Sequence, residues 1–304
     1  MPKNAFTKFE GIVTPLLSPL DKNERLIAKD LAKLVRYQIK SGVQALLAPS
    51  GSGECFALPD DERQRLVEIV VEAAAGKIPV IAMTADCGTR KVLKHIEAAR
   101  KAGADGVMVP PVYYTVIDQA VLKSFFLRLA DESGLPLWLY QQPQETKLTL
   151  EPATIAELAR HPNIGGIKIS HGADMLDYHR VVRATRDNPD FSVLMGEDIN
   201  DLSGWVLGGH GGVCTLANII PEEFIGLWHA VKRGDLATAR QLQDRIMDVC
   251  ELLILNPRCF QSACKLVLQK RGIFSTAINT HPLPALDAAG QKKILTEGKK
   301  LGLF

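Results

Sequence analysis

Short apolar runs alternate with longer amphipathic stretches along most of the chain. The runs are hydrophobic on both faces, which is typical of parallel strands covered by helices. The stretches at 60–75 and 88–103 carry apolar residues at i, i+3 and i+4 with charges between them, which predicts crossover helices. Eight runs fit the strand pattern: GIVTPL, VQALLAPS, IPVIAMTA, DGVMVPPV, LPLWLY, IGGIKIS, FSVLMG and GGVCTLA.

The number and spacing of these runs favour one architecture. An open doubly wound sheet would more often stop at about five or six strands, whereas eight βα units predict a closed (β/α)8 TIM barrel. We expect the barrel to occupy residues 1–234 and a C-terminal helical extension, packed on the barrel, to occupy 235–304. After the eighth run only helical patterns remain, at 221–233 (the eighth barrel helix), 235–255, 258–271 and 287–301.

Composition and charge narrow the class of protein. The net charge of +2 comes from interspersed residues, so nothing indicates a nucleic-acid partner, and a small metabolite is the expected ligand. No apolar run approaches the roughly 20 residues that cross a bilayer, and the N-terminus resembles no signal peptide. The six cysteines form neither C-x-x-C pairs nor metal-ligand spacings with histidines. We therefore expect reduced thiols, no metal site and a cytoplasmic protein.

Lys168 is the sharpest chemical candidate, because it interrupts the apolar sixth run in NIGGIKIS. The active site of a barrel lies at the carboxyl ends of its strands. A lysine buried there loses hydration, which favours its neutral amine, and such an amine condenses with a carbonyl to form a Schiff base. A side chain just beyond the strand, reaching solvent or a structural carboxylate, explains the sequence position equally well.

Tyrosines follow two of the predicted strands at the same end of the barrel. Tyr140 ends the fifth run in LPLWLYQQP, and Tyr113 and Tyr114 follow the fourth. The phenol of Tyr140 could exchange protons with a substrate, although an ordinary core tyrosine is the more common arrangement. Its significance rests on its lying at the same barrel end as Lys168.

The loop at residues 50–54, with the sequence SGSGE, resembles a backbone nest for an anion. Gly51 and Gly53 let successive N–H groups converge, and Ser52 adds a hydroxyl. A carboxylate suits this loop better than a phosphate, because Glu54 and Cys55 replace the Lys-Ser/Thr of a P-loop. A tight turn without a ligand is the alternative.

Other polar residues have weaker claims. His171 follows the Lys168 strand and could enter the site, but no histidine belongs to a metal-binding pair. Glu197 and Asp198 follow the seventh run and either contact the substrate or cap the next helix. The GGHGG segment at 208–212 predicts close packing at the bottom of the barrel.

Taken together, these motifs resemble the dihydrodipicolinate synthase and N-acetylneuraminate lyase family. The resemblance runs from GIVTPL through SGSGE, PPVYY, LYQQP and GIKIS to GEDINDLSGWVLGGHGGVCTLANIIP. It implies a class I aldolase-like mechanism without a cofactor, in which Lys168 attacks the 2-carbonyl of pyruvate or a related 2-oxo acid. Tyr140 matches the family tyrosine that shuttles protons, and Ser52 and Tyr114 match hydroxyls that extend this relay.

The resemblance also carries expectations about assembly and the substrate pocket. A tyrosine at the Tyr114 position often comes from a neighbouring subunit, so a homotetramer built from tight dimers is implied. The 50–54 loop, through Gly51, Gly53 and Glu54, would hold the substrate carboxylate. Cys214, in the eighth run, would line the pocket and make it less polar.

Two positions depart from the pattern of the family. Gly51 stands where a Thr or Ser is frequent, and Glu145 stands where the biosynthetic synthase branch carries an arginine that grips the second substrate's carboxylate. We therefore expect a lyase or aldolase acting on pyruvate or a 4-hydroxy-2-oxo acid, rather than a true dihydrodipicolinate synthase. The alternatives are a dehydratase of 2-keto-3-deoxy sugar acids, or a related hydro-lyase or deaminase, and a noncatalytic metabolite-binding barrel.

Overall fold

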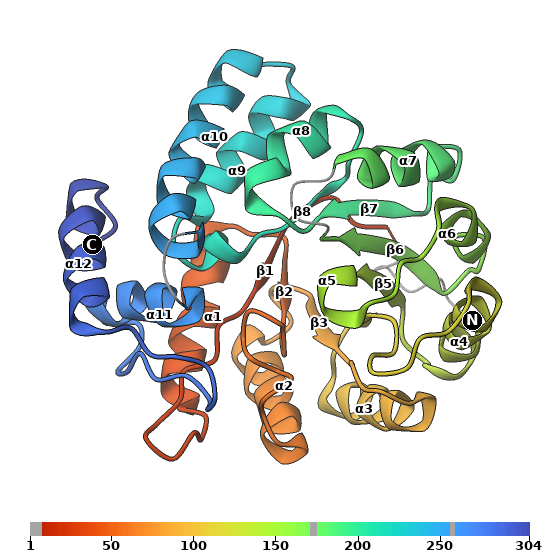
Figure 1. Ribbon diagram of the computed structural model, residues 1–304, viewed down its shortest axis with the longest axis horizontal. Helices are drawn as coiled ribbons and strands as arrows, with labels where there is room; N and C mark the ends of the chain where they lie inside the picture. Colours follow the sequence, from red (N-terminus) through yellow and green to blue (C-terminus); the bar gives the residue numbers. More distant parts are fainter. Residues whose placement is uncertain (1–7, 171–174, 256–258) are drawn as a thin grey trace.

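Each of the eight predicted runs contains a strand, and the strands close into a barrel (Figure 1). The computed structural model describes residues 8–170, 175–255 and 259–304. All neighbouring strands pair in parallel, from β1 through β8 and back to β1, which confirms the (β/α)8 barrel. The strands are β1 (Gly11–Pro15), β2 (Ala45–Leu47), β3 (Val80–Met83), β4 (Gly106–Val109), β5 (Leu137–Gln141), β6 (Ile164–Ile169), β7 (Ser192–Met195) and β8 (Gly211–Val213).

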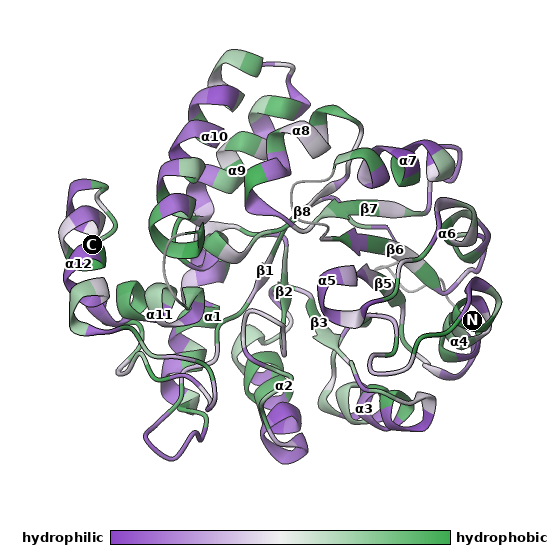
Figure 2. Ribbon diagram, viewed as in Figure 1, coloured by the Kyte–Doolittle hydropathy of each residue, from purple (hydrophilic) through white to green (hydrophobic). Residues whose placement is uncertain are grey.

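Helices follow the strands and surround the barrel (Figure 1). Apolar and polar residues alternate along these helices, as the hydropathy colouring shows (Figure 2), which is the pattern of helices with one buried face. The main barrel helices are α1 (Ala28–Ser41), α2 (Asp60–Ala74), α3 (Thr89–Ala102), α4 (Gln119–Glu132), α6 (Pro152–Leu158), α7 (Met175–Thr185), α8 (Asp201–Val206) and α9 (Pro221–Lys232). Short helical turns lie in the connecting loops: α5 (Pro143–Thr146), η1 (Asp198–Asn200) and η2 (Thr215–Asn218).

Alternation along the strands decides which side chains enter the barrel. On β5, Trp138 and Tyr140 belong to the cluster inside the barrel, whereas Leu137 and Leu139 pack in the layer beneath the helices. On β6, the neighbours of Lys168 on either side, Ile167 and Ile169, both belong to the outer layer. Because successive side chains of a strand point to opposite faces, Lys168 is directed to the inside.

The glycines at the start of β8 allow two strands to approach closely. Gly211 has a φ of +141°, and a Cβ atom built on it would lie 1.9 Å from the carbonyl oxygen of Gly11 in β1. His210 joins this end of the barrel, since its Nδ1 accepts the N–H of Val193 at 3.1 Å. The close packing predicted for the segment 208–212 is confirmed.

The C-terminal segment is helical, as predicted, and lies beside α1 and α9 (Figure 1). The predicted helix at 235–255 divides into α10 (Leu236–Cys250) and a π-helical turn, η3 (Glu251–Leu255). The remaining helices are α11 (Phe260–Lys270) and α12 (Ala288–Lys300). No helix in the described ranges is long and apolar enough to span a membrane.

Candidate active site

The structure brings Lys168 and Tyr140 together inside the barrel. They are directly opposite each other in the β5–β6 register, and the Nζ atom of Lys168 lies 4.1 Å from the centre of the Tyr140 ring. Each residue is only 8% exposed. Within the ranges that the structure describes, Lys168 forms no ion pair with a carboxylate. The alternative of a solvated or structurally paired lysine is therefore wrong for these residues.

The end of β7 is shaped to admit the Lys168 side chain. A Cβ atom at Gly196 would lie 2.7 Å from Cε of Lys168, 2.0 Å from Oγ of Ser170 and 2.8 Å from the carbonyl oxygen of Ile169. The Ser170 hydroxyl in turn donates to the Gly196 carbonyl at 3.2 Å. Any side chain at Gly196 would occupy the space through which Lys168 extends.

The hydroxyl of Tyr140 has a defined partner. It donates to Oε1 of Gln142 at 3.1 Å, just before α5. Gln142 also fixes α5, because its carbonyl accepts the N–H groups of Glu145 and Thr146. Because the side-chain amide of Gln142 is neutral, it orients the phenol proton of Tyr140 but does not remove it.

The 50–54 loop folds into the tight turn predicted from its glycines. The N–H of Glu54 donates to the Gly51 carbonyl at 3.0 Å, and the N–H of Gly53 donates to Oγ of Ser50 at 2.9 Å. Among the described residues, the N–H groups of Gly51 and Ser52 have no hydrogen-bond acceptor. The capacity of the loop to bind an anion therefore rests on these two amides and on the Ser52 hydroxyl.

The two glycines of this loop have different roles. A Cβ atom at Gly53 would lie 2.4 Å from the carbonyl oxygen of Leu16, so only glycine fits there. At Gly51 the nearest atom is Cε2 of Phe56, at 4.0 Å, and φ is not positive. Gly53 is therefore required by the fold, whereas Gly51 could be replaced by a residue with a side chain.

Ser52 has a partner that the sequence did not single out. Its Oγ lies 2.9 Å from Oγ1 of Thr215, the first residue after the Cys214 cap of η2, and either hydroxyl can be the donor. This contact links the loop after β2 to the loop after β8. Two hydroxyls in contact can pass a proton between them.

Glu54 does not have the expected role of a side chain that contacts the substrate. Its carboxylate is fully buried and forms an ion pair with Lys265 of α11. Its second oxygen, Oε2, accepts the N–H of Thr280 at 2.6 Å and the Thr280 hydroxyl at 2.8 Å. Because both oxygens are used inside the protein, this carboxylate is structural.

The two tyrosines after β4 lie in different environments. Tyr113 is partly buried, packs against the barrel's inner cluster, and stacks edge to face on Phe56 at 5.9 Å. Burial, the largest influence, and the charge of Asp86 raise its pKa. Tyr114 has a left-handed backbone, with a φ of +78°, and its side chain is 99% exposed. Within this one chain, Tyr114 therefore lies outside the inner cluster that holds Tyr140.

Cys214 lies in a buried acidic cluster rather than on an open pocket wall. Its thiol donates to Oδ2 of Asp201 at 3.3 Å, and burial followed by the charge of Asp201 raises its pKa well above the usual value. Asp198 accepts the N–H groups of Thr215 at 3.0 Å and Leu216 at 2.7 Å, so it caps η2 rather than the helix that follows it in the chain. The Cys214 thiol is thus directed toward Asp201, and its role in lining the pocket stays a prediction.

The acidic cluster is also the place where a metal would have to be considered. One potential ligand atom from each of Asp198, Asp201 and Cys214 lies within 4.8 Å of the others. Burial raises the pKa of Asp198 to about 7 and that of Asp201 well above its usual value. Both oxygens of Asp198 already accept backbone N–H groups, and Asp201 accepts the Cys214 thiol, so the residues of this cluster are held by hydrogen bonds to one another and to the η2 backbone.

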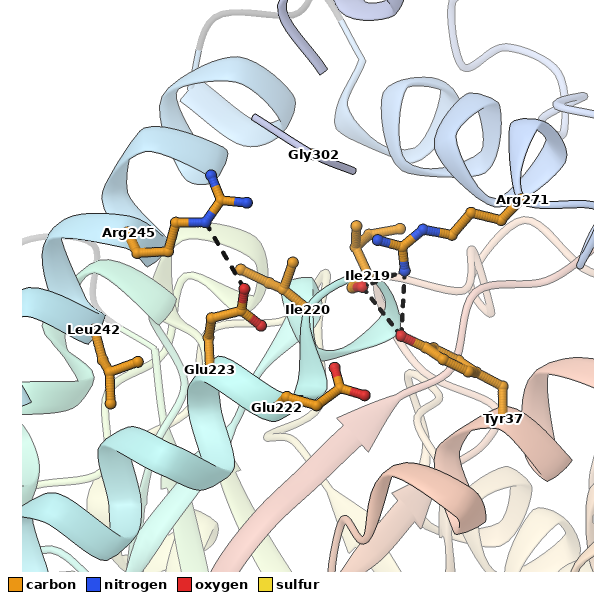
Figure 3. Close-up of a pocket in the computed structure, with 9 residues that line it drawn as sticks. All are labelled: Tyr37, Ile219, Ile220, Glu222, Glu223, Leu242, Arg245, Arg271 and Gly302. Atoms are coloured by element: carbon orange, nitrogen blue, oxygen red, sulfur yellow. Dashed lines mark hydrogen bonds and ion pairs between the residues drawn. The ribbon is translucent and has the colours of Figure 1, made fainter. Parts of the chain in front are cut away.

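A cavity of about 450 Å³ lies away from this barrel end, between the barrel and the C-terminal helices (Figure 3). Its two arginines are already engaged. Arg271 donates to the Ile219 carbonyl and to the hydroxyl of Tyr37, while Arg245 holds the Leu301 carbonyl and lies 3.7 Å from Glu223. This cavity therefore marks the docking of the extension and not the chemistry of Lys168.

Sequence reasoning missed three residues that shape the site: Gly196, Thr215 and Lys265. Gly196 directly follows β7 and Thr215 lies two residues after the end of β8, so their position at the carboxyl ends of strands is the available signal. Lys265 carried no comparable signal, because its partner Glu54 lies 211 residues earlier in the chain. His171 lies outside the described residues.

Comparisons with known proteins agree with this architecture. A model of the Dihydrodipicolinate synthetase family matches residues 8–299. A protein from Hyphomonas neptunium named 4-hydroxy-tetrahydrodipicolinate synthase is 33% identical over 287 residues, covering 94% of this chain and 96% of that protein. A protein of the same name from an Exiguobacterium species is 34% identical over 291 residues, covering 95% of this chain and 96% of its own.

Solved structures give the same result. A monomeric dihydrodipicolinate synthase variant superposes with a TM-score of 0.92 at 28% identity, covering 99% of both chains. YagE, an E. coli prophage protein solved in complex with pyruvate, superposes with a TM-score of 0.90 at 26% identity, covering 97% of this chain and 99% of its own. The match extends over the barrel and the C-terminal helices together. The chain belongs to the dihydrodipicolinate synthetase family and is a lyase of the class I aldolase type.

Proposed function

We propose that Lys168 forms a Schiff base with a 2-oxo acid and that the enzyme reversibly cleaves a 4-hydroxy-2-oxo acid to pyruvate and an aldehyde. The observation that carries this proposal is the position of Lys168 inside the barrel, buried, without a carboxylate partner among the described residues and facing Tyr140. A buried amine that is not held in a close ion pair is suited to nucleophilic attack. The pyruvate bound to YagE supports a 2-oxo acid as the substrate class.

The proposed chemistry uses the groups that converge on this site. The amine of Lys168 adds to C2 of the 2-oxo acid, water leaves, and the resulting iminium carries the positive charge. Loss of the C4 hydroxyl proton then breaks the C3–C4 bond, and the bonding electrons move into the iminium to give an enamine and an aldehyde. Protonation of the enamine at C3 and addition of water to the resulting iminium release pyruvate and free the amine of Lys168. Tyr140, oriented by Gln142, would transfer this proton. The amides of Gly51 and Ser52 would hold the substrate carboxylate.

We further propose that this chain is not a biosynthetic dihydrodipicolinate synthase, although its curated relatives carry that name. Glu145 is exposed on α5, close in sequence to Tyr140 and Gln142. A carboxylate there would repel the second substrate's carboxylate, which an arginine would attract. We expect the wild type to release little condensation product from that substrate. Glu145→Arg should increase this product, measured by coupled reduction, while Glu145→Gln should give a smaller increase; no increase in either variant contradicts the assignment.

The exposed Tyr114 supports a proposal about assembly. A fully exposed tyrosine held by a left-handed backbone is positioned to enter a neighbouring copy, so we propose a homotetramer built from tight dimers. Sedimentation measures the oligomer directly. Mixed Lys168→Ala and Tyr114→Ala subunits should recover part of the activity if Tyr114 serves its neighbour's site. We also propose a reducing, cytoplasmic location, which the six free cysteines support.

Trapping of the imine tests the central proposal. The protein is incubated with pyruvate and borohydride, and peptide mapping by mass spectrometry locates the reduced adduct. We expect an adduct on Lys168 in the wild type and in Lys123→Ala, a variant of a half-buried lysine on α4, but none in Lys168→Ala. If neither pyruvate nor longer 2-oxo acids give an adduct while ligand binding persists, a noncatalytic binding barrel replaces the proposal.

Product analysis separates the lyase from the dehydratase alternative. Both reactions begin with the same iminium, and a dehydratase would expel the C4 hydroxyl instead of breaking the C3–C4 bond. Pyruvate and an aldehyde, detected by NMR, support cleavage. A product with an intact carbon chain would instead establish a dehydratase acting on a deoxy sugar acid.

A further inference from the structure

The 50–54 loop is held from two sides. On the barrel side, the hydroxyl of Ser18 donates to the Gly53 carbonyl at 2.6 Å, and the hydroxyl of Ser50 donates to the Leu16 carbonyl at 3.0 Å. On the opposite side, the described residues that bind the Glu54 carboxylate both belong to the C-terminal extension: Lys265 and Thr280. The loop is therefore held between the segment that follows β1 and the last fifth of the chain.

The ion pair between Glu54 and Lys265 is completely buried. Both side chains are 0% exposed, and Lys265 also donates to the Ile278 carbonyl at 2.7 Å. A buried pair of this kind contributes little net stability compared with apolar residues, but the loss of one partner leaves a charge buried without compensation. The pair is thus better suited to fixing a position than to stabilising the fold.

Glu54 transmits this constraint to the amides that would bind the substrate. It has a left-handed backbone, with a φ of +66°, which non-glycine residues rarely adopt without external support. Its N–H donates to the Gly51 carbonyl, which belongs to the same peptide group as the N–H of Ser52. If Glu54 rotates, that peptide group rotates with it and its N–H turns away from its present direction.

We propose that Lys265 is a positioning residue for the substrate-carboxylate site. It acts through Glu54 to fix the direction of the Ser52 amide, without touching the substrate. This inference rests on the proposed function, in which that amide and the Gly51 amide hold the carboxylate of a 2-oxo acid. It assigns to the C-terminal extension a part in substrate binding.

The test measures pyruvate binding separately from imine formation. In a Lys168→Ala background, which cannot form the imine, calorimetry compares the affinity for pyruvate with and without Lys265→Met. We expect Lys265→Met to weaken binding about tenfold, the loss of roughly one hydrogen bond to a charged group. In a protein that retains Lys168, Lys265→Met should raise the pyruvate concentration at which borohydride trapping of the imine is half-maximal. At saturating pyruvate the adduct should still form on Lys168.

Two further variants keep the result interpretable. Thr280→Val removes one hydroxyl donor to Glu54 but keeps the Thr280 N–H, and it should weaken pyruvate binding in the same direction by about threefold. It decides the question if Lys265→Met does not fold. Lys270→Met, an exposed lysine on the same helix, is the matched control and should leave binding unchanged.

The outcomes distinguish the two proposals. A lower melting temperature with unchanged pyruvate affinity in both Lys265→Met and Thr280→Val would make the pair purely structural and overturn the inference. Failure to trap an imine in the wild type, with pyruvate affinity still dependent on Lys265, would instead reject the Schiff base and leave the positioning role intact.

Discussion

A methyl group at Gly196 should disable Lys168 without removing any polar group from the site. In Gly196→Ala the new Cβ would lie 2.0 Å from Oγ of Ser170 and 2.7 Å from Cε of Lys168, whereas ordinary contacts begin at 3.4 Å. Relief requires the Lys168 carbon to move by about 0.7 Å (3.4 − 2.7) and the Ser170 oxygen by about 1.4 Å (3.4 − 2.0). The carbonyl oxygen of Ile169 would lie 2.8 Å from the new Cβ. Because this oxygen belongs to the backbone, it cannot move aside as a side chain would.

The displacement predicts a large kinetic effect. A misplacement of about 1 Å at a reacting group costs on the order of 100-fold in rate, or about 2.7 kcal/mol of activation free energy. Overpacking should also lower the free energy of unfolding by about 1–3 kcal/mol. We therefore expect imine formation with pyruvate, followed by borohydride quenching at timed intervals, to slow about 100-fold at a temperature where Gly196→Ala is still folded.

The control introduces a side chain where there is room for one. Gly88, before α3, has no atom within 4 Å of its ideal Cβ, so Gly88→Ser should form the imine at the wild-type rate. A wild-type rate in Gly196→Ala would refute the reasoning, because it would mean that Lys168 reaches the carbonyl by a path that does not pass Gly196.

Two further predictions concern protons. Burial raises the pKa of Asp198 to about 7 in the folded state, against 3.8 for an unperturbed carboxyl. Between these pH values Asp198 holds a proton in the folded protein that it has released in the unfolded chain. The free energy of unfolding should therefore fall as the pH rises from about 4 to 7, and Asp198 should account for at most about 4 kcal/mol of this fall. Urea titrations at several pH values should show this slope reduced in Asp198→Asn, and an undiminished slope would exclude Asp198 as its source. Gly51→Ser fits the available space and adds a hydroxyl beside Ser52. It should accelerate the exchange of pyruvate methyl protons with deuterated solvent about threefold or more, and unchanged exchange in NMR would show that no relay passes through residue 51.

The barrel could be predicted from the sequence because its strands are buried on both faces. Apolar runs such as that around Leu137–Gln141 signal burial without any knowledge of their partners. The ends of the elements were less predictable. The second run continues to Pro49, but β2 stops at Leu47, and a proline cannot donate a ladder hydrogen bond. The π-helical turn at Glu251–Leu255 continues the apolar pattern of α10, so periodicity alone did not separate them.

The candidate site was predictable where its chemistry depends on a single strand. Lys168 interrupts one apolar run and Tyr140 ends the neighbouring one, and the register of the two adjacent parallel strands places them opposite each other. Glu54 was assigned to the substrate because a loop carboxylate gives no local sign of its partner. That partner, Lys265, lies on a helix that the pattern marks only as amphipathic, and only the fold reveals that the two charges meet.

The contact between Glu54 and Lys265 also bears on when the 50–54 loop can reach its folded conformation during synthesis of the chain. A growing chain emerges from the ribosome with its N-terminus first. The 50–54 loop is therefore exposed to solvent long before Lys265 and Thr280, which lie 211 and 226 residues later, leave the exit tunnel. Until then Glu54 is hydrated and its left-handed backbone lacks the support seen in the folded protein. Nascent chains that already contain all eight strands and Lys168 would still lack a finished 50–54 loop, so maturation of the first half of the barrel waits for translation of the last helices.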